Sequence, residues 1–145
     1  MTAATADRLA VYAAQRGMPL DLDYPMTASA TVYMNCLVNA DSAGRVKNGT
    51  DAATEFCMGV GTKTVTCSAV AGSSRAVIRS NVVVEFFIDG ANIDASDVGK
   101  NASILDNQTV TDAATAANDV RIGEIVGVEN GKAYVWVGHF APSAA

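Results

Sequence analysis

The sequence feature that most constrains the fold is a hairpin signal near the C-terminal end. Residues 120–128 and 132–137 are rich in valine and isoleucine and flank Glu129-Asn130-Gly131. An Asn-Gly pair between two such runs is the strongest local signal for a β-hairpin, because both residues accept the positive φ angles of a two-residue turn. Gly123 and Gly127 interrupt the strict alternation of the first run. We therefore predict that the chain ends in an antiparallel pair of strands.

Five further segments have the composition of β-strands. Each is rich in β-branched or aromatic residues and ends near Gly, Asn, Asp or Ser, which favour turns. Half of the 145 residues are apolar and only 17% are charged, a balance that excludes a disordered chain. We predict an all-β fold, a small β-barrel or sandwich of seven to nine strands, that includes residues 31–39, 56–70, 76–88, 102–105 and 109–111.

Three irregularities are expected within this pattern. Gly59 and Gly61 indicate a bulge or a sharp bend inside a strand. The most apolar window, residues 76–88, is expected to be a central strand with a bend at Ser80-Asn81. Residues 94–100 predict a short helical turn, capped by Asp94 or Ser96 and ended by Gly99.

The chain divides into an N-terminal arm (residues 1–26), a β-barrel or sandwich body (27–140) and a short tail (141–145). The arm is predicted to be extended or partly helical. Within residues 1–17, Leu9, Tyr12 and Ala13 share a helical face, and Gly17 followed by Pro19 is a helix stop signal.

The second half of the arm alternates between apolar and acidic residues. Asp21 and Asp23 point to one face of an extended segment, and prolines at both ends favour an edge strand or a free arm. Such a segment pairs either with a neighbouring chain by strand addition or with the sheet of its own domain, and the sequence leaves both alternatives open. The candidate interface residues, on the apolar face, are Met18, Leu20, Leu22, Tyr24 and Met26.

Charge and hydropathy exclude two classes of partner. Ten basic residues against fifteen acidic ones give a net charge of −5, and the basic residues do not cluster. Nucleic acids repel such a chain, since their affinity for proteins comes largely from contacts with Lys and Arg. No run approaches the roughly 18 apolar residues of a membrane-spanning helix, and no signal peptide is visible. We therefore expect neither a nucleic acid nor a membrane as a partner, and synthesis in the cytoplasm.

No residue pattern predicts catalysis, a metal or a cofactor. His139 is the single histidine, and nothing in the spacing brings it to a serine or cysteine nucleophile. Asp89, Asp94 and Asp97 do not match a calcium-binding loop and are expected to stabilise turns. Trp136 is expected in the core or in an interface, with a ligand platform formed by Trp136 and Tyr134 as the alternative. The three cysteines, expected to be reduced and buried with a single bridge as the alternative, are Cys36, Cys57 and Cys67.

Several short motifs occur in an order typical of one family of viral proteins. The sequence resembles the small capsid decoration (cement) proteins of tailed bacteriophages over about residues 27–138. The motifs that carry the resemblance are Thr31-Val-Tyr-Met-Asn-Cys-Leu-Val38 with a turn at Gly44, Phe56-Cys-Met-Gly59-Val, Asp97-Val-Gly-Lys100, Asp106-Asn107-Gln-Thr-Val110, Ile122-Gly-Glu-Ile-Val126 and Asn130-Gly-Lys-Ala-Tyr-Val-Trp-Val137.

The resemblance implies a structural virion protein that binds the outside of a phage head. Its partner would be the major capsid protein, and it would act without a cofactor, as a trimer near the three-fold positions of the capsid surface. The arm, residues 1–26, lies outside the resemblance. Two alternatives stay open at this point: a phage tail or head-completion structural component, and a small-ligand-binding β-module.

Overall fold

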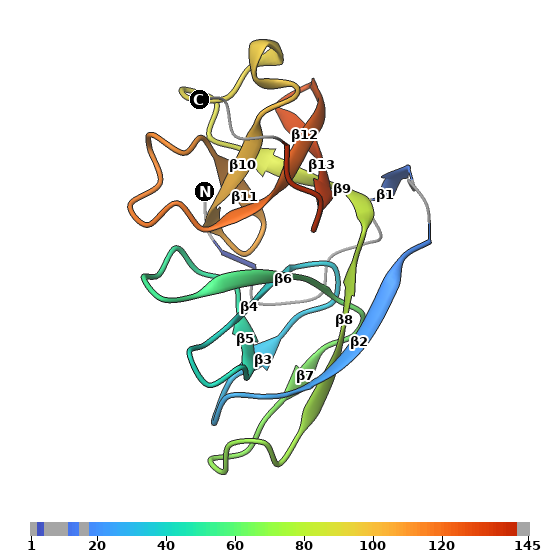
Figure 1. The fold of residues 1–145 in the computed structure, drawn as a ribbon, viewed down its shortest axis with the longest axis vertical. Helices are drawn as coiled ribbons and strands as arrows, with labels where there is room; N and C mark the ends of the chain where they lie inside the picture. Colours follow the sequence, from blue (N-terminus) through green and yellow to red (C-terminus); the bar gives the residue numbers. More distant parts are fainter. Residues whose placement is uncertain (1–2, 5–11, 15–17, 142–145) are drawn as a thin grey trace.

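The C-terminal half of the chain forms a closed barrel of five strands. In a computed structural model that describes residues 3–4, 12–14 and 18–141, the strand order is β9-β11-β10-β12-β13, and β13 pairs again with β9 (Figure 1). All pairs are antiparallel except β9 with β11, which is parallel. The barrel strands are β9 (Val82–Ile88), β10 (Asn101–Asp106), β11 (Thr109–Thr111), β12 (Arg121–Glu129) and β13 (Lys132–Val137).

A second, open sheet lies beside the barrel, below it in Figure 1. Its order is β2-β8-β6-β4-β5, and all of its pairs are antiparallel. A two-stranded ladder of β3 (Thr31–Val32) and β7 (Val65–Thr66) accompanies it. The sheet strands are β2 (Leu20–Pro25), β4 (Leu37–Ala40), β5 (Val46–Asn48), β6 (Phe56–Gly61) and β8 (Arg75–Ser80).

Strand β4 joins two apolar cores because its side chains alternate between opposite faces of the sheet. Leu37 is buried in the core of the barrel side, together with Phe86 and Ile104. Val38, the next residue, is buried in a second core with Met26 and Ile78. All four residues of β4 are buried, so the open sheet is covered on both faces at this strand.

The predicted bend in the strand of residues 76–88 is confirmed, and it connects the two sheets. β8 ends at Ser80, β9 begins at Val82, and Asn81 between them has a φ of +58°. Asn81 donates its backbone N–H to the carbonyl of Val137, and its side chain accepts a hydrogen bond from the indole N–H of Trp136 at 2.8 Å. One bent strand therefore carries the chain from the open sheet into the barrel.

The other expected local features are also confirmed. Asn130 and Gly131 have φ angles of +53° and +75° in the β12–β13 turn, as the hairpin signal requires. The β4–β6 register shifts next to Gly59, where we expected a bulge. The helical turn is the 3₁₀ helix η1 (Ala95–Asp97), capped by Asp94.

The prediction of an all-β fold is confirmed, but it placed too few strands. Thirteen strands lie within the described ranges, because bulges and bends divide the long apolar windows into shorter pieces. Residues 12–14 form strand β1, which pairs with β9, so the predicted helix is wrong at these positions. The remaining residues of that helix, and tail residues 142–145, lie outside the described residues. None of the described helical segments is long and apolar enough to cross a membrane.

Candidate interaction surface

The alternating segment of the predicted arm is an edge strand of the chain's own sheet. β2 pairs with β8 along its whole length, with Leu20 opposite Ser80, Leu22 opposite Ile78 and Tyr24 opposite Ala76. This is the second of the two alternatives that the sequence left open. β2 therefore extends the body, and its outer edge has no partner strand in the described part of the chain.

Burial increases steadily along the apolar face of this strand. Met18 is 84% exposed, Leu20 50% and Leu22 44%, while Tyr24 packs against the second core. Met26 is fully buried in that core, so it stabilises the body and contributes nothing to an exposed surface. The exposed part of the predicted interface is thus its N-terminal part, Met18 just before β2 and Leu20 and Leu22 within it. We call these three residues the apolar edge.

Two ion pairs hold β2 on β8 from the opposite face. Arg79 makes two hydrogen bonds to the carboxylate of Asp21, at 2.8 and 2.9 Å, and Arg75 binds Asp23 at 2.9 Å. The hydrogen bonds from Arg79 lower the pKa of Asp21 below its usual value. Asn81 adds a hydrogen bond from its side chain to the carbonyl of Met18 at 2.8 Å. The apolar edge is therefore presented by a strand that polar contacts fix in place.

We expect Arg79→Gln to raise the pKa of Asp21 towards its ordinary value of about 3.9. Because the pKa of the folded state lies below that of the unfolded state, the pairing stabilises the fold above about pH 4, and this contribution is lost as the pH falls through the folded pKa. An NMR titration of the Asp21 carboxyl in the two proteins measures the shift. Arg121→Gln, which removes the partner of Asp119, should leave the pKa of Asp21 unchanged. An unchanged pKa in the Arg79 variant would refute the assignment.

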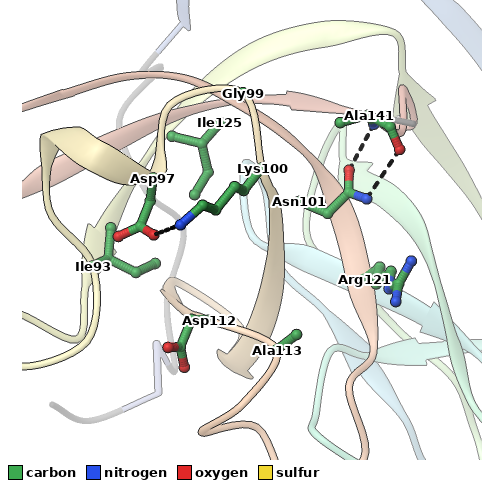
Figure 2. A pocket seen from close by; sticks show the side chains of 10 residues that line it. All are labelled: Ile93, Asp97, Gly99, Lys100, Asn101, Asp112, Ala113, Arg121, Ile125 and Ala141. Carbon is green, nitrogen blue, oxygen red and sulfur yellow. Dashed lines mark hydrogen bonds and ion pairs between the residues drawn. The ribbon is translucent and has the colours of Figure 1, made fainter. Parts of the chain in front are cut away.

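A small pocket opens in the barrel between η1, β10, β12 and the loop after β11. Its volume is about 210 Å³, below the roughly 300 Å³ at which small-molecule sites begin. Figure 2 shows Lys100 paired with Asp97 on one side, at 3.1 Å, and Asn101 bonded to Ala141 on the other. The charged groups of the wall are of both signs, Asp97 and Asp112 against Lys100 and Arg121. The pocket therefore has no charge preference that points to one ligand class.

The structure gives Trp136 and His139 a packing role. Their rings stack with centroids 3.7 Å apart and an interplanar angle of 16°, and the Trp136 indole N–H is bonded to Asn81. One face of the indole is thus covered by the imidazole, which does not suit the open platform of the ligand-binding alternative.

The aspartates considered as calcium ligands stabilise turns, and the three cysteines are reduced. Asp89 accepts hydrogen bonds from Asn92 and Thr111, and Asp94 caps η1. In the described ranges no cluster of His, Cys, Asp or Glu is suited to hold a metal ion. Cys36, Cys57 and Cys67 are free thiols, and burial raises the pKa of Cys57 to about 12.

The chain was compared with family models, with curated proteins and with solved structures. None of the three comparisons found a match.

The fold leaves several further apolar side chains exposed that no sequence pattern indicates. Phe56, Val70 and Phe140 are between 50% and 67% exposed, on β6, on the loop before β8 and after β13. No alternation marks these residues, because each stands beside a turn where apolar and polar residues mix. They are dispersed over different elements, whereas Leu20 and Leu22 lie on one face of β2 and Met18 lies just before that strand.

Proposed function

We propose that this chain is a structural virion protein that binds the outside of a phage head and stabilises the capsid lattice, as a trimer. The observation that carries the proposal is the apolar edge: the exposed side chains of Leu20 and Leu22 on β2, with Met18 just before it, beside a strand edge that is unpaired in the described structure. A strand of this kind can bind an extended segment of another protein through backbone hydrogen bonds and apolar contacts. The resemblance to capsid decoration proteins supports the major capsid protein as that partner.

The charges on β2 favour a different protein over a second copy of this strand. Antiparallel pairing of two β2 strands that places Leu22 opposite Leu20 or Leu22 of the other copy would place Asp21 opposite Asp21 or Asp23. Like charges in opposite positions destabilise a strand pair, and acidic residues with proline are common protection of sheet edges. Pro19 precedes this strand and Pro25 is its last residue. We therefore assign β2 to the contact with the capsid and the trimer contact to another surface.

Capsid stabilisation follows from binding alone. A protein that binds the assembled lattice and not its separated subunits stabilises the lattice by mass action. A trimer that contacts several capsid subunits gains further affinity, because its second and third contacts form at a high effective concentration. A brace of this kind needs a rigid body and an exposed contact strand. β2 is such a strand, since it pairs with β8 and two ion pairs link it to that strand.

The double substitution Leu20→Ser with Leu22→Ser tests the proposal. Each leucine is about half exposed, so its burial in a contact is worth about 1 kcal/mol. The two together should weaken binding to undecorated heads of the encoding phage roughly 30-fold per contact. Bound protein is measured by sedimentation of the heads followed by gel densitometry. Deletion of residues 1–26 is a poorer test, because it also removes Met26 from the core.

Val70→Ser is the matched control, since Val70 is 67% exposed on the loop before β8. This loop contacts Met26, beyond the end of β2 that lies opposite the apolar edge. It should bind heads as the unmodified protein does. The Val70→Ser protein and the double variant should both retain the thermal unfolding temperature of the unmodified protein. Equal head binding by the double variant and the unmodified protein would reject the role of the apolar edge. Failure of the unmodified protein to bind heads would reject the function itself.

A further inference from the structure

Two asparagine side chains beside β10 bind the backbone of segments near the two ends of the chain. The side chain of Asn107 accepts a hydrogen bond from the N–H of Ala4 at 2.7 Å and donates one to the carbonyl of Ala4 at 2.9 Å. The side chain of Asn101 accepts from the N–H of Ala141 at 2.7 Å and donates to the carbonyl of Ala141 at 3.3 Å. Asn101 is the first residue of β10, and Asn107 follows its last residue.

The two contacts have the same chemistry. A carboxamide carries an acceptor and a donor side by side, and it pairs with the N–H and C=O of one residue as a residue in an antiparallel strand does. The contact is made to backbone atoms, so it does not select the side chain of the bound residue. Proline alone is excluded at that residue, since it lacks the N–H.

Asn107 also lies at the junction of the barrel and the open sheet. Its side chain is fully buried and donates a second hydrogen bond to the side-chain oxygen of Asn48 at 2.9 Å. Its backbone carbonyl accepts from the N–H of Leu37 at 2.8 Å. Residues 3–4, the short dark blue piece below the N label in Figure 1, therefore meet the body where the two sheets adjoin.

Loss of the contact between Ala4 and Asn107 would destabilise this junction. The side-chain oxygen of Asn107 accepts its hydrogen bond from Ala4, and a buried polar atom without a partner costs about 1–3 kcal/mol. Asn101 and Ala141 form the equivalent contact at the edge of the barrel pocket, as Figure 2 shows. Both asparagines thus favour occupation by the N–H and C=O of a backbone residue.

We propose that Asn101 and Asn107 are docking sites for the backbone of a single residue, and that they fasten Ala141 and Ala4 of the same chain to opposite ends of β10. Each site recognises the N–H and C=O of one residue, Ala141 in the first site and Ala4 in the second. Ala4 is therefore attached to the body through Asn107. The proposal does not depend on capsid binding, and its test needs the isolated protein alone.

Hydrogen exchange followed by NMR on the full-length protein tests both sites together. In the unmodified protein the amides of residues 4 and 141 should exchange about tenfold more slowly, or more, than in an unstructured peptide. Asn107→Ala should abolish protection at residue 4 and retain it at residue 141, and Asn101→Ala should do the reverse. Each variant is the control of the other. Unprotected amides in the unmodified protein, or simultaneous loss at both residues in either variant, would overturn the proposal.

Two substitutions at residue 4 keep the test valid should Asn107→Ala fail to fold. Ala4→Pro removes the N–H that Asn107 accepts, so the side-chain amide protons of Asn107 should shift and exchange faster. Ala4→Ser retains the backbone groups and should leave those protons unchanged. Equal effects of proline and serine would show that the backbone is not what Asn107 recognises. Protection that increases with protein concentration would place the segment of a second copy in the site, against the proposal.

Discussion

Replacement of Phe86 by alanine is expected to lower the free energy of unfolding by about 3–5 kcal/mol. Phe86 is the largest fully buried side chain and lies on β9, which pairs with β11 and β13 to close the barrel. Its ring packs in the same core as Leu37 and Val60 of the open sheet. The cavity left by the ring would therefore weaken the barrel and its contact with the second sheet together.

Urea denaturation, followed by circular dichroism, measures this loss as a lower midpoint at unchanged slope. The thermal midpoint should fall by roughly 10–15 °C. Phe140→Ala removes the same ring from a position that is 50% exposed and should cost less than about 1 kcal/mol. Similar costs for the two substitutions would contradict the position of Phe86 in the barrel core.

The second large effect is expected for Gly123→Ala. Gly123 has a φ of +156° in β12, next to a shift in the register with β10, and an added Cβ would overlap the backbone carbonyl of Trp136 on β13. The overlap cannot be relieved by rotation of a side chain, because the obstructing atoms belong to the backbone of the paired strand. We expect a loss of about 3 kcal/mol or more, from the strained φ and the forced separation of the strands.

Gly90→Ala is the control for this substitution. Gly90 stands in the turn after β9, where an added Cβ meets no atom within 4 Å. The alanine variant should match the unmodified protein within about 0.5 kcal/mol. A Gly123→Ala protein as stable as the Gly90→Ala protein would show that β12 and β13 do not approach each other as closely as described.

Local features of the fold could be predicted because neighbouring residues determine them. The Asn130-Gly131 turn needs two residues that tolerate positive φ, and Asp94 caps the following 3₁₀ turn through its own side chain. The bend at Asn81 belongs to the same class, since asparagine adopts the left-handed region more readily than β-branched residues do. In each case the signal lies within a few residues of the feature.

The candidate surface could be predicted only in part, for a reason visible within β2. Alternation placed Met18, Leu20, Leu22, Tyr24 and Met26 on one face, and the pairing with β8 keeps Leu20, Leu22 and Tyr24 there. The alternation could not show that this face is exposed to solvent at Met18 and buried in the core at Met26. The period of a strand specifies direction, whereas burial depends on which distant residues cover that direction.

The amino-acid sequence by itself determined that the chain is all-β, where its tightest turns lie, and which side of residues 18–26 is apolar. The tertiary structure alone decided that this segment pairs with β8, that β13 returns to β9 to close a barrel, and that Asn107 binds Ala4 across 103 positions of the chain. Turn and strand preferences act between neighbours in the sequence. Strand pairing and backbone docking join residues far apart, and their partners are chosen by the packing of the whole molecule.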